Sequence, residues 1–157
     1  QNVRGYVYGE IGGLLASFMA GLALGAAWGE RRRDRPKFTL AALTAASCLL
    51  LLTLPRAAEQ LGRLEASLLS AAGFWALVVV SGFLDGAVFP PLVAWAASSG
   101  QAQAGGDSYA WDLVGAALGA LLCGAVWLPL FGLAGAMAAV AALQVCALAA
   151  LLLLRAP

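Results

Sequence analysis

The chain has 157 residues, of which 62% are hydrophobic and 11% are charged, and its net charge is +1. A soluble domain carries about twice that charged fraction, and the mean hydropathy here is +0.88, so we expect lipid to surround the protein. A net charge so close to zero excludes the basic surface that nucleic-acid binding requires. The sequence therefore predicts an all-α, polytopic membrane protein with one transmembrane helical domain over residues 1–157.

Composition also narrows the chemistry. The chain contains no histidine, which removes histidine metal ligands and histidine general bases. Its three cysteines stand singly in apolar runs, without CxxC spacing, and are interpreted as small buried hydrophobes; they are Cys48, Cys123 and Cys146. No nucleophile is paired with a base, so we expect neither an enzyme nor a cofactor.

Five apolar segments have roughly the length of a membrane span. The first is rich in glycine and ends abruptly in ERRRDRPK, and the second is short because Pro36 and Pro55 bound it. The third is too long for one straight span. The LFGL junction between the last two is so tight that it predicts an antiparallel helical hairpin. The predicted spans cover residues 6–28, 38–54, 67–97, 109–130 and 133–154.

Two longer connections separate these spans. Residues 55–66 are predicted to form a small amphipathic helix on the outer surface, and residues 98–108 a flexible inner linker. The linker contains AGGDS (104–108), which looks like the glycine-rich acidic motif of nucleotide-binding folds. No strand precedes it, so we interpret it as linker only.

Lysine and arginine counts predict the orientation of the protein. With ERRRDRPK inside, six basic residues fall on the inner side and three on the outer side. We therefore expect an outer N-terminus and a cytoplasmic C-terminus, in a bacterial inner membrane. The inner six are Arg31, Arg32, Arg33, Arg35, Lys37 and Arg155, and the outer three are Arg4, Arg56 and Arg63.

The third predicted span contains GFLDGAVFPP, in which two prolines remove backbone donors and two glycines loosen the helix. This pattern predicts a bent or broken helix that lines a cavity. The residues of the predicted break are Gly82, Gly86, Pro90 and Pro91.

Three acidic residues lie in or near spans, where an ionised carboxylate is costly and usually faces protein or water. Asp85 is the deepest, and either binds a proton or cation or makes a structural contact, inside the chain or with a partner. Glu10 lies near the outer end of the first span, within reach of the interface. Asp112 lies near the N-terminus of the fourth span, which favours a negative charge, and we expect it to pair with the Arg31–Arg35 cluster.

Small residues recur at a spacing of four along two predicted helices. In lipid, helices associate through close backbone approach, which such residues permit. The sequence leaves open whether these stripes pack within the chain or face a partner. The stripes are Gly21, Gly25 and Gly29 on the first span, and Gly115 and Gly119 on the fourth.

Several of these motifs resemble a known family. GLALGAAWGERRRDRP resembles the cytoplasmic loop between the second and third helices of major facilitator transporters. More closely, YVYGEIGGLLASFMAGLALG looks like the membrane part of fused transporter-like/spermidine-synthase-like proteins. GFLDGAVFPPL resembles that family's G-x-x-x-G-x-x-FP helix, and YAWDLVGAALGALLCGAVWLPLFGL its Y-A-x-D-L-x-G-A-A-L-G-A-L helix.

The resemblance implies that the five spans correspond to helices two to six of a six-helix, major-facilitator-like half. No aminopropyltransferase domain is present, so polyamine synthesis does not carry over. The basic loop also lacks its standard aspartate, because Trp28, Gly29 and Glu30 stand at that place. A complete carrier of this kind has two six-helix halves, so we expect this half to act as a dimer or with another chain.

Two functions remain as hypotheses. The first is a non-catalytic integral subunit that packs through glycine-rich helices into a larger, energy-transducing membrane complex. The second is a transporter-type module, a half-carrier acting as a dimer, that moves a small solute or a polyamine-like cation. Both imply membrane lipid and either other integral membrane chains or a homodimer as partners.

Overall fold

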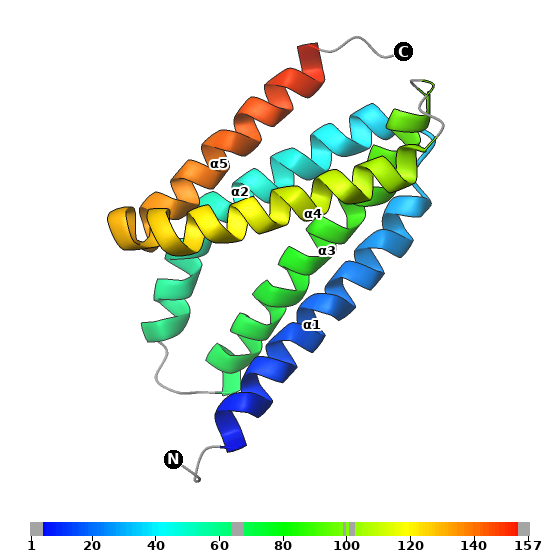
Figure 1. Ribbon diagram of the computed structural model, residues 1–157. Coiled ribbons are helices and arrows are strands. Elements are labelled where there is room, and N and C mark those ends of the chain that lie inside the picture. The colour runs from blue at the N-terminus through cyan, green and yellow to red at the C-terminus, as the bar shows by residue number, and fades with distance from the viewer. Residues whose placement is uncertain (1–4, 64–67, 99, 101–102, 154–157) are drawn as a thin grey trace.

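The computed structural model describes residues 5–63, 68–98, 100 and 103–153. Within these ranges every regular element is a helix, and no strand is present, which confirms the predicted all-α membrane bundle (Figure 1). Arg4 and Arg155, which entered the orientation count, lie outside these residues. The elements are α1 (Gly5–Glu30), α2 (Pro36–Arg63), α3 (Leu68–Ser98), α4 (Ala104–Leu122), the π-helical segment η1 (Cys123–Trp127) and α5 (Leu128–Leu153).

Four segments are long and apolar enough to cross a membrane, which supports an integral, multi-pass membrane protein in contact with lipid. The last two predicted spans lie within one uninterrupted segment of 50 residues, 104–153, so the described residues hold four candidate segments where the sequence predicts five spans. No linker separates its two arms. Gly132 alone interrupts the helical backbone, with φ 66° and ψ −176°, a conformation that glycine adopts readily. The chain reverses there, inside the LFGL junction (Figure 1).

Pro55 does not end α2, contrary to the prediction. Pro55 was expected to close the second span, with a separate surface helix after it, but α2 continues through Pro55 to Arg63 as one helix. The side chain of Arg63 pairs with Glu59 one turn earlier, with 2.6 Å between nitrogen and oxygen. The predicted amphipathic helix is therefore, in its described part, the last two turns of α2.

The predicted linker before the fourth span is also wrong in part. α4 begins at Ala104, so AGGDS forms its first turn rather than a connection. Asp107 lies in that first turn, where its negative charge complements the exposed N–H groups of the helix end.

The third span is not broken, because α3 runs continuously from Leu68 to Ser98 with Pro90 and Pro91 inside it, and the bend expected at these residues stays a prediction. These prolines remove the donors that would serve the carbonyls of Gly86 and Ala87. A neighbouring helix makes this tolerable. A Cβ added at Gly29 would lie 2.5 Å from the Ala87 oxygen, so the backbone of α1 approaches that carbonyl closely, as weak Cα–H···O contacts between helices require.

Helices α1, α3, α2 and α5 are packed in that order. α1 packs along α3, and α2 contacts both α3 and α5. The few strongly buried apolar side chains lie on these helices and at the start of α4, among them Leu40, Leu43, Ala87, Ala104, Ala136 and Ala141.

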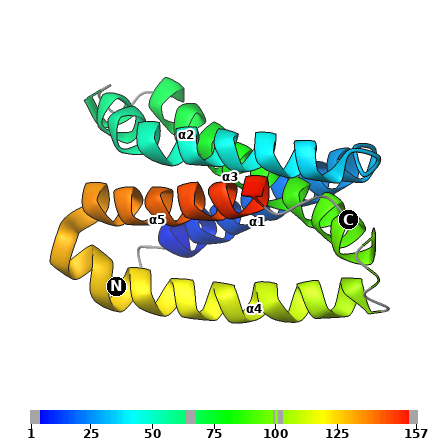
Figure 2. The same ribbon diagram turned by 90° about the horizontal axis from the view of Figure 1, so that it is seen from above.

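α4 stands apart from α2 and α5. Among the described elements it contacts only α3 and η1, and Figure 2 shows it separated from α5 although the two arms meet at η1. Every residue from 111 to 122 is exposed.

Candidate functional site

Close approach of α1 and α3 forms one wall of the candidate site. A Cβ at Gly21 or Gly25 would overlap the carbonyl oxygens of Val79 and Phe83 on α3. The same holds in reverse, since a Cβ at Gly86 would overlap the carbonyl of Leu22. We call this contact the glycine seam; it comprises Gly21, Gly25 and Gly29 on α1, and Gly82 and Gly86 on α3.

An acidic cavity of about 340 Å³ opens beside the glycine seam, at the place where α4 approaches α3. Two of its lining residues are carboxylic acids and one is a phenol, while the rest of its wall is apolar. Three helices contribute: Leu22 and Ala26 come from α1, Asp85 and Phe89 from α3, and Tyr109 and Asp112 from α4.

The structure thus brings together two of the three acids singled out from the sequence. Asp85 and Asp112 both line the acidic cavity, and both side chains are exposed where the cavity opens. Neither makes a hydrogen bond or ion pair with another described residue. An ionised carboxylate only accepts hydrogen bonds, so two such groups beside one another favour a bound cation or a shared proton.

The expected pairing of Asp112 with the Arg31–Arg35 cluster is wrong. Among the described residues the cluster's one ion pair joins Arg33 to Glu30, which is three residues earlier in the chain. Asp112 lies instead at the α3–α4 contact, because α4 approaches α3 along the side that carries Asp85.

The third acid, Glu10, lies on the exposed surface of α1 and outside the acidic cavity. Tyr109 belongs to the cavity but was not singled out from the sequence. It precedes Asp112 by three positions, and residues at this spacing share one helix face. That spacing was the available signal.

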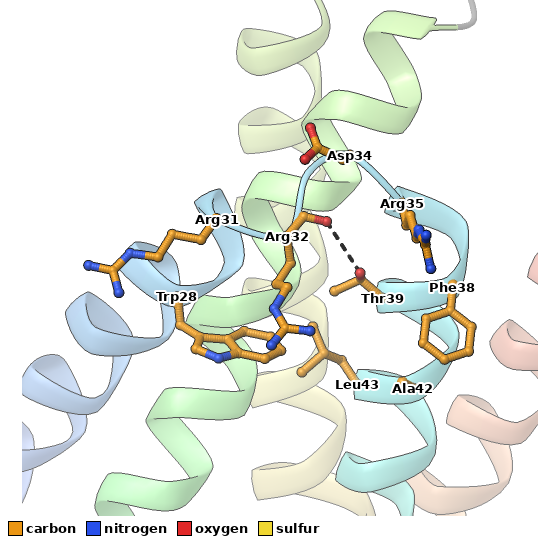
Figure 3. Close-up of a pocket in the computed structure, with 9 residues that line it drawn as sticks. All are labelled: Trp28, Arg31, Arg32, Asp34, Arg35, Phe38, Thr39, Ala42 and Leu43. Carbon is orange, nitrogen blue, oxygen red and sulfur yellow. Dashed lines mark hydrogen bonds between the residues drawn. The ribbon is translucent and has the colours of Figure 1, made fainter.

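A basic cavity of about 410 Å³ lies at the turn between α1 and α2. Figure 3 shows Arg32 and Arg35 reaching into it from opposite sides, whereas Arg31 extends away. Lys37 lies elsewhere, and its Nζ donates a hydrogen bond to the carbonyl of Leu152 at 3.4 Å. The predicted basic loop therefore does not act as one cluster.

The second predicted glycine stripe is open. A Cβ at Gly115 or Gly119 would have no neighbour within 4 Å. The sequence left internal packing and a partner-facing surface as alternatives. Within the described chain, internal packing holds for the stripe on α1 and fails for the stripe on α4.

No group of three or more Asp, Glu, Cys or His side chains close enough to hold a metal ion is present among the residues that the structure describes. Two carboxylates and a phenol leave protonation, or a cation bound with few direct ligands, as the chemistry of the acidic cavity.

No model of a known protein family, no curated protein and no solved structure matches this chain. The resemblance to fused transporter-like/spermidine-synthase-like proteins therefore stays a prediction from sequence motifs.

Proposed function

We propose that the chain is a transporter-type membrane module, a half-carrier that a second copy of the same chain completes. In this proposal Asp85 and Asp112 bind a proton or a small cation during transport. The observation that carries it is the convergence of the two carboxylates in one cavity among apolar helices. Carboxylates within membrane spans are costly and are usually found in substrate or proton pathways.

The glycine seam changes the balance between the two sequence-based hypotheses. The stripe on α1 supported an external packing surface while its contacts were unknown. Its glycines now contact α3 within the same chain, so they no longer favour a packing subunit over a carrier.

The exposure of the Asp85 and Asp112 side chains supports a second carrier half that covers them. The cavity is open in this chain alone, and its open side meets lipid, water or protein. An aspartate facing lipid at the centre of a span costs about 2.5–3.5 kcal/mol on insertion scales. A further helical half that covers the opening removes this cost and turns the cavity into an enclosed site.

Transport through proteoliposomes tests this proposal. A pH-sensitive dye inside the vesicles reports proton movement after a membrane potential is imposed, with and without external spermidine as a polyamine-like cation. We expect Asp85→Asn and Asp112→Asn to abolish the dye response, because asparagine keeps the shape and loses the charge.

Glu10→Gln is the matched control, since it removes an acid of the same helical bundle that lies outside the acidic cavity. It should leave transport unchanged. Parent protein without a dye response under either condition, or aspartate variants that respond like the parent, would contradict the carrier proposal.

A second candidate function is supported by α4. Its open stripe at Gly115 and Gly119 favours a non-catalytic subunit that packs on another membrane chain. Purification in mild detergent distinguishes the two candidates. A different protein at fixed stoichiometry supports the subunit, while a monodisperse homodimer supports the half-carrier.

The finer membrane placement also belongs to this proposal: a bacterial inner membrane, with the Arg31–Lys37 loop in the cytoplasm. Single cysteines at Arg33 and at Arg63, labelled from outside intact cells, test the orientation. We expect label at position 63 and none at position 33. The reverse result would invert the topology.

A further inference from the structure

The basic cavity combines charged and apolar lining residues. The guanidinium groups of Arg32 and Arg35 line it together with the apolar side chains of Trp28, Phe38 and Leu43 (Figure 3). This combination is independent of the acidic cavity and plays no part in the proposed transport.

The position of the basic cavity relative to the membrane follows from the apolar helices. The apolar part of α1 ends at Glu30 and that of α2 begins at Pro36. The turn between them, 31–35, therefore lies at the membrane surface, with its arginines at headgroup level. Phe38 and Leu43 extend from there along the hydrocarbon side.

The two arginines are held in place. The guanidinium of Arg32 lies 5.0 Å from the centre of the Trp28 ring, a cation–π distance. Its carbonyl accepts a hydrogen bond from the Thr39 hydroxyl at 3.3 Å, and the Arg35 carbonyl accepts one from the Thr39 N–H at 3.0 Å. One residue of α2 thus fixes the backbone at both arginines.

The charge of the basic cavity is not compensated within the described chain. Arg33 is paired with Glu30, whereas Arg32 and Arg35 have no carboxylate at ion-pair distance among the described residues. Asp34 lies at the rim, and its carboxylate points away from both guanidinium groups (Figure 3). Two arginine forks facing one space complement a phosphodiester.

We propose that the basic cavity binds the headgroup of an anionic phospholipid. The phosphate lies between Arg32 and Arg35, and the acyl chains run down beside Phe38. This side chain is 74% exposed, and a lipid chain covers its ring. Free phosphate would leave the ring uncovered, so the apolar wall selects the lipid as the source of the phosphate.

Native mass spectrometry of the detergent-solubilised chain tests the proposal. Phosphatidylglycerol and phosphatidylcholine with the same acyl chains are added separately, and the fraction of protein that retains one lipid is measured. We expect preferential retention of phosphatidylglycerol. Arg35→Gln should weaken it about five-fold, the effect of one basic residue near an anionic lipid.

Arg33→Gln is the matched control, because it removes the same charge from the same turn outside the basic cavity. Lipid retention by this variant should stay within about two-fold of the parent, because Arg33 takes part in an exposed ion pair with Glu30, and such pairs contribute little. Phe38→Ala should lower retention without any change in charge, and excess inorganic phosphate should not displace the lipid.

Three results would each overturn the lipid site. The first is equal retention of the two lipids. The second is an equal loss in Arg33→Gln and Arg35→Gln, which would indicate net charge alone. The third is displacement by inorganic phosphate together with no effect of Phe38→Ala, which would indicate a free-anion site. Far-ultraviolet circular dichroism of each variant checks that it is folded.

Discussion

Two glycine stripes with the same spacing have opposite surroundings in this molecule. On α1, Gly21, Gly25 and Gly29 lie against the backbone of α3, whereas a Cβ placed at Gly115 or Gly119 on α4 would meet no other part of the described chain within 4 Å. Spacing therefore indicates that a helix is able to pack closely, and says nothing of whether it does. The difference comes from the helix that faces each stripe. α3 faces the stripe on α1 with two glycines of its own, Gly82 and Gly86, whereas no described helix faces the stripe on α4.

The partner glycines also explain why the seam is so close. Where both helices lack side chains, the carbonyls of one reach the Cα atoms of the other, and weak Cα–H···O contacts recur along the interface. α4 contacts α3 beside Asp85 and Leu92, through larger residues such as Tyr109. A cavity forms there instead of a seam.

The largest expected effect is that of a large side chain in the glycine seam. Gly25→Leu places four carbons where a Cβ alone already overlaps the Phe83 carbonyl. We expect a loss of about 3 kcal/mol or more, because rigid backbone cannot make room. Thermal unfolding in detergent, followed by circular dichroism, measures it. Gly119→Leu is the control, and an equal loss in both variants would show that leucine itself, and not the seam, causes the effect.

A smaller substitution distinguishes the two sides of the seam. Gly25→Ala on α1 and Gly86→Ala on α3 each add one carbon that overlaps a carbonyl of the opposite helix. We expect each to cost about 1–3 kcal/mol. The double variant should lose less than the sum, because one shift of the helices relieves both overlaps. Strict additivity would indicate that the two contacts are independent.

Gly13 lies on α1 outside the seam and is expected to be more tolerant. A Cβ there would meet the ring of Trp75, the far end of a side chain. The ring is able to turn away, so Gly13→Ala should cost less than about 1 kcal/mol. In a Trp75→Ala background the cost should vanish. A loss as large as that of Gly25→Ala would mean that the ring is fixed.

Sequence reasoning predicted the fold class because hydropathy is a local property. It did not predict the continuity of α2 and α3, because the rule that proline ends a helix takes no account of lipid surroundings. In lipid, breaking a helix exposes more backbone than Pro55, Pro90 or Pro91 removes, so the helix continues.

The acidic cavity was predicted in parts. Asp85 and Asp112 were each singled out, because an acid in an apolar run is visible in the sequence. Their convergence depends on how α4 crosses α3, which no local pattern contains. For the same reason, the sequence did not predict that Arg32 and Arg35 line the basic cavity while Arg33 does not. The turn and the hydrogen bonds of Thr39 to the carbonyls of Arg32 and Arg35 set where these side chains lie.

The smallest expected effect has the opposite sign and tests whether α4 is truly unpartnered. Gly119→Ala adds a carbon that meets nothing within 4 Å, and alanine favours helix over glycine by about 1 kcal/mol. The isolated chain should therefore become slightly more stable in detergent unfolding.

In the native membrane the result depends on a partner. If another chain packs on this stripe, the same carbon separates two backbones, and complex recovered by affinity purification should fall while the isolated chain gains stability. Loss of stability in the isolated chain would show that α4 folds back onto a neighbour, and the contrast between the two stripes would then be wrong.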